Sequence, residues 1–138
     1  MRAFIDTSSL FKKYVDEKGA DTFDVLIQSV SEIIIAPVTQ LEINSTIERR
    51  LREKTLSTSD ANWIMKEFMF DFNFFGVVEY NDVLISECIR VIRTYQMKVL
   101  DGIQLSSAIT AQSEVFIVSD KSLYKTASKE LKRVEFIG

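Results

Sequence analysis

The chain has 138 residues, no histidine, one cysteine and a formal net charge of −3 at neutral pH. Without histidine, neither a Ser-His-Asp triad nor a Cys-His pair can form, and a single cysteine excludes an internal disulfide and a cysteine-rich zinc site. The acidic balance disfavours a protein that binds nucleic acid through charge alone, although a nucleic-acid enzyme with a metal-neutralised acidic site remains compatible with it. A catalytic site in this chain must use carboxylates, lysines, hydroxyls or hard metal ions.

The length and composition are typical of one globular domain over residues 1–138, because no repeat, low-complexity tract or Pro/Gly/Ser-rich linker divides the sequence. No apolar run approaches the roughly 20 residues of a membrane-spanning helix. Asp6 also interrupts the apolar stretch at the N-terminus too early for a signal peptide. We therefore expect a single cytoplasmic domain that makes no membrane contact.

The predicted elements alternate between short apolar runs and helically spaced segments. The run Ala3-Phe4-Ile5 is apolar throughout, as in a strand buried on both faces, and it ends at Asp6. Further strands are predicted at 33–35, 77–78, 115–118 and 134–137, and helices at 7–14, 20–30, 39–54, 58–70, from 81 or 82 to a break at 98–101, 102–112 and 121–132. Strands separated by helices predict a three-layer α/β/α fold with a mostly parallel sheet.

Two local features of this pattern bear on packing. Apolar spacing in the helix that begins at 81 or 82 places Val83, Leu84 and Cys88 on its buried face. The aromatic-rich segment 68–75 invites an interpretation as a base-stacking surface, but an apolar run of this kind is more typical of a core or dimer contact.

Four of the twenty acidic residues lie where predicted helices begin: Asp6, Glu42, Asp101 and Asp120. Two of them also end strands, and Glu42 follows the second strand after a short loop. Helices that flank a parallel sheet begin near the carboxyl ends of its strands, so the four side chains can converge at that edge. Helix capping is the alternative, because aspartates are good N-caps and Thr39-x-x-Glu42 has the form of a capping box.

Convergence of four carboxylates would create strong mutual repulsion. Two carboxylates about 5 Å apart repel by roughly 3 kcal/mol at an effective dielectric near 20, and the six pairs together would exceed the stability of a typical domain. Such a cluster must take up protons or cations. Oxygen ligands without histidine or cysteine select Mg²⁺ or Mn²⁺, and these ions can activate water for hydrolysis of a phosphodiester.

Four segments, in this order, resemble the PIN domain and especially the small VapC-type ribonuclease toxins: Phe4-Ile-Asp-Thr-Ser-Ser-Leu10, Val38-Thr-Gln-Leu-Glu-Ile43, Leu100-Asp-Gly-Ile-Gln-Leu-Ser-Ser-Ala108 and Phe116-Ile-Val-Ser-Asp120. The resemblance spans essentially the whole chain. It implies a Mg²⁺-dependent endoribonuclease that is usually a homodimer and is held inactive by a co-expressed antitoxin.

The same resemblance assigns roles to residues. It implies that Asp6 and Asp101 are direct metal ligands and that Glu42 and Asp120 complete the catalytic, metal-binding site. Thr7 and Ser8 resemble supporting hydroxyls of the family. The sequence departs from the family at Gly102, where alanine is usual, and at Ser106 and Ser107, which replace small apolar residues. These departures bear on local packing more than on catalysis.

Basic residues also occur near the predicted site: Lys12, Lys13, Arg49, Arg50 and Lys121. Lysine and arginine supply most contacts to phosphate backbones, but a solvated helix face is the favoured explanation for most of these residues.

We therefore predict a metal-dependent endoribonuclease that acts on RNA and has a cognate antitoxin. One alternative is a non-catalytic PIN-like scaffold that binds a partner protein, which the presence of all four acidic residues disfavours. Another is a phosphohydrolase acting on a different phosphate ester, for example one that forms an aspartyl-phosphate at Asp6. Ser8 stands where a haloacid-dehalogenase-like enzyme would have aspartate, and this weakens that alternative.

Overall fold

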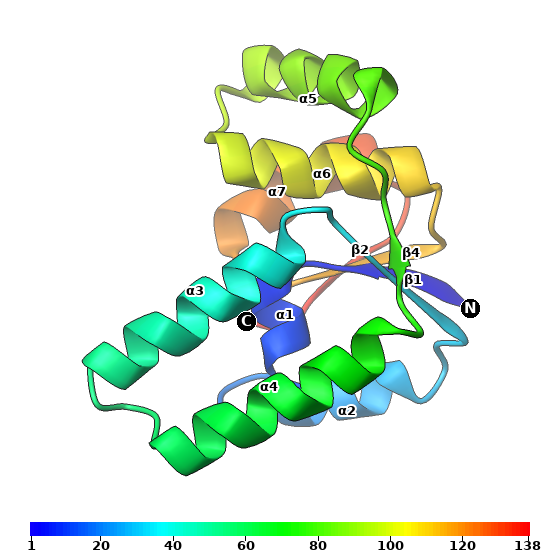
Figure 1. The fold of residues 1–138 in the computed structure, drawn as a ribbon. Coiled ribbons are helices and arrows are strands. Elements are labelled where there is room, and N and C mark those ends of the chain that lie inside the picture. The colour runs from blue at the N-terminus through cyan, green and yellow to red at the C-terminus, as the bar shows by residue number, and fades with distance from the viewer.

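A parallel five-stranded sheet lies between two layers of helices in the computed structural model, which describes residues 1–138 (Figure 1). This arrangement confirms the predicted three-layer α/β/α fold. The strands are β1 (Arg2–Ile5), β2 (Glu32–Ile35), β3 (Gly76–Val77), β4 (Val115–Val118) and β5 (Val134–Phe136). The helices are α1 (Thr7–Phe11), α2 (Ala20–Ile27), α3 (Thr39–Arg52), α4 (Thr58–Phe72), α5 (Asp82–Tyr95), α6 (Val99–Ala111) and α7 (Lys121–Glu130). None of these helices is both long and apolar enough to cross a lipid bilayer.

The first strand, β1, occupies the centre of the sheet, whose order is β3-β2-β1-β4-β5. It pairs in parallel with β2 on one side and with β4 on the other. The first three strands therefore run from the centre of the sheet, at β1, to one edge, at β3. The chain then returns through α5 and α6 and adds β4 and β5 on the other side of β1. In sheets of this order a crevice opens at the carboxyl ends of the two strands where the direction reverses, here β1 and β4.

Both faces of β1 are buried, as its unbroken apolar run predicts. Ala3 and Ile5 join a core that includes side chains from α1 to α4, whereas Phe4 joins a second core formed with α5, α6 and α7. Neighbouring strands divide in the same way, since Ile117 faces the first core and Phe116 the second. The sheet is therefore held from both sides, and the residue that follows β1 is held in a defined position.

Several boundaries differ from the sequence-based expectations. Helix α6 begins at Val99 rather than at 102, because Lys98 has the extended conformation of an N-cap and the helix continues from it. Helix α4 continues to Phe72, beyond the predicted end at residue 70, so the transition to β3 is shorter than expected. Val83 is 65% exposed, so its predicted inward position is wrong. Leu84 and Cys88 are buried as predicted.

Gly102 permits α6 to approach α5 closely. A Cβ atom added at this position would lie only 2.8 Å from Cγ1 of Ile92 on α5, and Ile92 would have to move. Two other unusual residues of α6, Ser106 and Ser107, are fully buried; the Ser106 hydroxyl donates to the carbonyl of Ile103, 3.2 Å away. The residues that depart from the family pattern thus lie in the packed interior of the α5–α6 layer.

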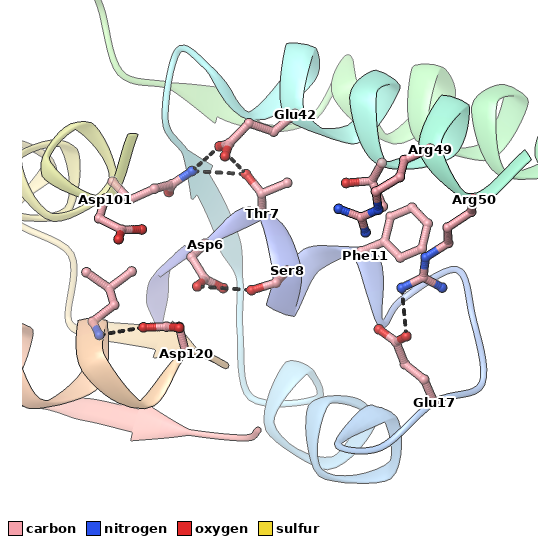
Figure 2. A pocket seen from close by; sticks show the side chains of 13 residues that line it. Asp6, Thr7, Ser8, Phe11, Glu17, Glu42, Arg49, Arg50, Asp101 and Asp120 are labelled. Atoms are coloured by element: carbon pink, nitrogen blue, oxygen red, sulfur yellow. Dashed lines mark hydrogen bonds and ion pairs between the residues drawn. The ribbon is translucent and has the colours of Figure 1, made fainter. Parts of the chain in front are cut away.

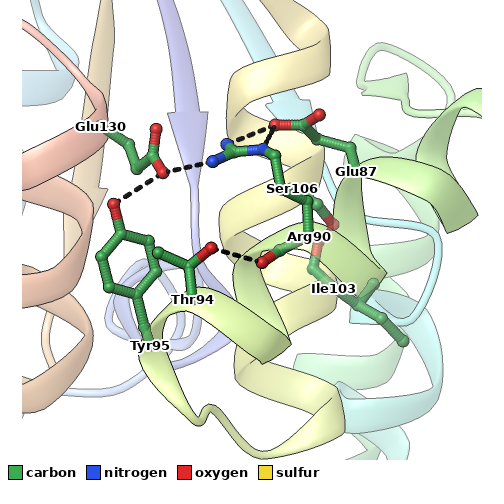
Figure 3. Close-up of polar contacts among 7 residues, drawn as sticks. All are labelled: Glu87, Arg90, Thr94, Tyr95, Ile103, Ser106 and Glu130. Atoms are coloured by element: carbon green, nitrogen blue, oxygen red, sulfur yellow. Dashed lines mark hydrogen bonds and ion pairs between the residues drawn. The ribbon is translucent and has the colours of Figure 1, made fainter.

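A polar network joins the ends of α5 and α7 (Figure 3). The Arg90 guanidinium lies 2.9 Å from a carboxylate oxygen of Glu130, and the Tyr95 hydroxyl donates to that same oxygen over 2.7 Å. The hydrogen bond from Arg90 lowers the pKa of Glu130. Arg90 also contacts Glu87 one turn earlier on α5. This network fixes Tyr95 beside the start of α6.

The aromatic segment 68–75 is divided between the core and the surface. Phe68 is fully buried, and its ring packs near those of Tyr14, Phe72 and Phe75. Phe70 and Phe74, with ring centroids 5.5 Å apart, are 63% and 71% exposed. The core prediction therefore holds for Phe68, and the two exposed rings form an aromatic surface on α4 and the turn after it.

Replacement of Phe68 by alanine should lower the free energy of unfolding by about 3–5 kcal/mol, because it leaves a cavity in the first core. The matched control is Phe70→Ala on the same helix, which should change that free energy by less than about 0.5 kcal/mol because the ring is exposed. Chemical denaturation followed by circular dichroism measures both. Equal losses for the two variants would contradict the assignment of Phe68 to the core.

Candidate active site

A hollow of about 310 Å³ lies at the carboxyl edge of the sheet, and all four predicted acidic residues line it (Figure 2). Asp6 comes directly after β1, and Asp120 is separated from β4 only by Ser119. Glu42 comes from the first turn of α3 and Asp101 from the first turn of α6. The fold thus brings together side chains that are up to 114 residues apart in sequence, from 6 to 120. Their catalytic and metal-binding roles remain predictions.

Asp6 is the most buried of the four carboxylates, with 3% of its surface exposed. It caps α1, accepting a hydrogen bond of 2.9 Å from the backbone N–H of Ser9, and the Ser8 hydroxyl donates to its other oxygen. Burial nevertheless raises the pKa of Asp6 to about 6, because the loss of hydration outweighs these hydrogen bonds. Capping and membership of the site are therefore compatible for this residue.

Asp120 and Asp101 also line the hollow, and the charge of Asp120 acts on Asp101. Asp120 caps α7, since its carboxylate accepts a 2.7 Å hydrogen bond from the backbone N–H of Leu123. Asp101 is not a cap, because Lys98 holds the N-cap position of α6. Partial burial and then the negative charge of Asp120 raise the pKa of Asp101, while Lys98 opposes the shift. The two carboxylates are thus close enough to repel.

Glu42 is held by side chains from two other elements. Its Oε1 atom accepts hydrogen bonds of 2.8 Å from the Thr7 hydroxyl and 2.8 Å from the Gln104 amide (Figure 2). The N-cap of α3 is Val38, which makes no side-chain cap bond, so the predicted capping box of Thr39 and Glu42 is wrong. The capping alternative therefore fails for Glu42 and Asp101.

Gln104 is a residue of the site that sequence reasoning missed. It is 4% exposed, and its amide nitrogen also lies 2.9 Å from the Thr7 hydroxyl and 3.4 Å from that of Thr39. Its Oε1 atom is buried without a hydrogen-bond partner. The available signal in the sequence was a glutamine one turn after Asp101, between Ile103 and Leu105, since a polar side chain in an apolar stretch requires partners when it is buried.

None of the four acidic residues is paired with a lysine or arginine. Ion pairs elsewhere use other carboxylates, such as Glu17, which lies 3.0 Å from Arg50 at the far end of the same hollow. The four are not crowded around one point, however, because no group of three or more acidic residues is arranged to hold an ion together. Strong repulsion among all six pairs of carboxylates, as expected from the sequence, is therefore an overestimate. The repulsion that raises a pKa in the structure is that of Asp120 on Asp101.

The donor set still suits a hard divalent cation. Mg²⁺ commonly binds through one or two carboxylates and keeps several water ligands, so three convergent protein ligands are not required. All candidate donors here are oxygen atoms, and the one cysteine, Cys88, is buried in the second core. A cation beside Asp6 would also offset the unfavourable burial of its negative charge.

The profile of the PIN domain family matches residues 3–129. No curated protein sequence matches the chain significantly.

Solved structures resemble the chain over nearly its whole length. PAE2754 from Pyrobaculum aerophilum is 17% identical, with a TM-score of 0.72 over 99% of this chain and 90% of that one. FitAcB from Neisseria gonorrhoeae is 9% identical, with a TM-score of 0.69 over 99% and 96% of the two chains. VapBC2 from Rickettsia felis, bound to a DNA fragment from its promoter, is 10% identical, with a TM-score of 0.67 over 99% and 98%. At these identities, the likeness shows a shared fold.

The buried Asp6 carboxyl should make the stability of the metal-free protein depend on pH. Its folded-state pKa of about 6 lies above the usual value of 3.8, so the folded state binds this proton more tightly than the unfolded chain does. The resulting stabilisation is present at low pH and is lost as the pH rises through the folded-state pKa. Asp6→Asn abolishes this titration but keeps the helix cap, because asparagine caps as well as aspartate.

The quantity to compare is the free energy of unfolding of Asp6→Asn minus that of the unsubstituted protein. We expect this difference to increase by up to about 3 kcal/mol as the pH rises from about 4 to about 7, because only the unsubstituted protein loses the stabilisation. Denaturant titrations in EDTA at a series of pH values measure this difference. A difference that stays constant with pH would contradict the effect assigned to burial.

Proposed function

The chain belongs to the PIN domain family, and we propose that it is a Mg²⁺-dependent endoribonuclease, the toxin of a VapBC-type toxin–antitoxin pair. One observation carries the proposal: four carboxylates without cationic partners line a single hollow at the carboxyl edge of a parallel sheet. Asp6 is the strongest case, since it is buried: an unpaired buried charge is costly, and a protein that did not use it would gain by pairing or replacing it.

In this proposal, Asp6 and Asp101 hold the metal ion directly, and Asp120 and Glu42 complete the site. The ion, Mg²⁺ or Mn²⁺, supplies Lewis-acid stabilisation of the charge that develops on the phosphate oxygens. The protein contributes preorganisation, because the hydrogen bonds from Ser8 and Ser9 fix the orientation of the Asp6 carboxylate before substrate binds.

Glu42 is the residue best suited to accept a proton from the attacking water. Its Oε1 atom is occupied by Thr7 and Gln104, whereas Oε2 makes no hydrogen bond in the structure. A carboxylate fixed at one oxygen presents the other in a defined direction, which is what general-base catalysis requires in a chain without histidine. Thr7 and Gln104 are positioning residues in this scheme.

The toxin role is supported by the proteins that share the fold. One, from Klebsiella pneumoniae, is described as a toxin–antitoxin complex; it is 15% identical, with a TM-score of 0.62. We propose that this chain likewise has a protein antitoxin and that it forms a homodimer. The exposed rings of Phe70 and Phe74 provide an apolar surface of the kind that protein partners cover.

Replacement of Asp101 by asparagine should reduce cleavage of single-stranded RNA in Mg²⁺ or Mn²⁺ by at least about 100-fold, because one ligand charge is lost while shape is kept. Asp82→Asn, at the start of α5 and outside the hollow, is the matched control and should cleave at the normal rate. Gel assays of end-labelled RNA measure both. EDTA should abolish cleavage, and added Mg²⁺ should restore it. Cleavage that survives EDTA or Asp101→Asn would refute the mechanism.

Expression of the chain in a bacterial host should arrest growth and generate new RNA 5′ ends, whereas Asp6→Asn at the same protein level should do neither. The substitution retains the α1 cap, so the protein should accumulate normally. Growth curves, immunoblots and mapping of RNA 5′ ends provide the measurements. Arrest that is independent of Asp6, without new RNA ends, would show toxicity through another activity and favour a protein-binding scaffold.

A further inference from the structure

The acidic site lies in the middle of a longer groove. Asp101, Asp120 and Leu123 line the 310 Å³ hollow described above and also an adjoining hollow of about 270 Å³. We propose that these two hollows form one track for single-stranded RNA, in which Arg49 and Lys98 bind the phosphates on opposite sides of the bond that is cut. The inference rests on the proposed nuclease function and names the residues that position its substrate.

Charge restricts how a polyanion can approach this groove. The lining includes five carboxylates, and its basic residues are Arg49 and Arg50 in the first hollow and Lys98 in the second. A cation at the central carboxylates can neutralise one phosphate, but the flanking phosphates of a strand would still face negative charge. Basic side chains on both flanks are therefore the groups that can hold them.

Arg49, rather than its neighbour Arg50, is available for this role. The guanidinium of Arg50 lies 3.0 Å from Glu17 and 4.5 Å from the ring centroid of Phe11, so it is already neutralised and packed. The side chain of Arg49 is 55% exposed, and its one ion pair is a long contact of 3.9 Å with Glu53 on the same helix. Exposed pairs of this kind contribute little and are easily exchanged for a phosphate.

Lys98 occupies the corresponding place in the second hollow. It is exposed, forms no ion pair, and lies at the N-cap of α6, three residues before Asp101. Lys98 and Asp101 line this hollow together, so the ammonium group lies beside the acidic site. Tyr95, held by Glu130 as shown in Figure 3, lines the same hollow and gives it a rigid wall.

The dimensions favour a single strand. The two hollows, of about 310 and 270 Å³, lie near the lower limit of small-ligand sites, a size that suits the nucleotides of one strand better than the width of a duplex. Because Asp101 and Asp120 line both hollows, a strand that follows the two would continue on both sides of the cleaved bond. This arrangement predicts cleavage within the strand rather than at its ends. It also explains how a protein with a net negative charge can bind RNA, through two basic residues beside the site.

The test measures RNA binding separately from catalysis. In an Asp101→Asn background with Mg²⁺, fluorescence anisotropy of a labelled single-stranded RNA of about 12 nucleotides is followed over a range of salt concentrations. Arg49→Ala and Lys98→Ala should each weaken binding by about tenfold and reduce the slope of log K against log salt by about 0.7. The double substitution should reduce the slope by about twice that amount, and Arg49→Lys or Lys98→Arg should restore it.

Matched controls are Arg52→Ala on α3 and Lys66→Ala on α4, which are exposed residues that line neither hollow. They should leave the slope unchanged, and thermal unfolding should show that all variants are folded. Variants at Arg49 and Lys98 that behave like these controls would overturn the proposal. Absence of salt-dependent RNA binding, or equal affinity for duplex RNA, would overturn it as well.

The outcome can be separated from that of the proposed function. RNA cleavage that requires Asp101 but is indifferent to Arg49 and Lys98 would leave the nuclease assignment intact and remove the groove. RNA binding that depends on Arg49 and Lys98, without cleavage in Mg²⁺ or Mn²⁺, would support the groove and refute the nuclease.

Discussion

The burial of β1 on both faces is the constraint on which the site depends. Because Phe4 is packed on one side and Ile5 on the other, the strand cannot shift, and Asp6 must emerge at the crevice between β1 and β4. The same packing removes Asp6 from water, which raises its pKa and makes its ionised form unfavourable in the absence of a cation. A well-packed core thus creates a place where positive charge is needed.

The other acidic residues show that capping and site chemistry are not exclusive. Backbone N–H groups at a helix start stabilise negative charge, so Asp6 and Asp120 can cap helices and still face the hollow. Glu42 is oriented differently, through side chains of α1 and α6 that reach it from separate parts of the chain. The buried amide of Gln104 therefore couples the packing of α6 to the orientation of a carboxylate on α3.

The α5–α6 layer has a comparable influence on the second half of the groove. Gly102 lets α6 lie close against Ile92, and the early start of this helix places Asp101 in its first turn with Lys98 just before it. The Arg90–Glu130–Tyr95 network then ties α5 to α7, whose first turn follows Asp120. Packing between helices, rather than the sheet alone, thus determines the distance between acidic and basic groups along the groove.

Sequence by itself was sufficient to predict the parallel sheet, the order of its elements and the four acidic residues at helix starts, because apolar periodicity and strand–helix alternation are local properties of the chain. Only the tertiary structure decided that Glu42 is not part of a capping box, that Gln104 belongs to the site and that Phe68 is buried while Phe70 is not. It also decided that Arg50 pairs with Glu17, outside its own helix, whereas Arg49 pairs only with Glu53 on the same helix. These outcomes depend on contacts between distant residues, such as Thr7 with Gln104 and Glu17 with Arg50. Periodicity identifies the face of a helix that is buried, but the partner of each polar side chain is set by how the helices pack together.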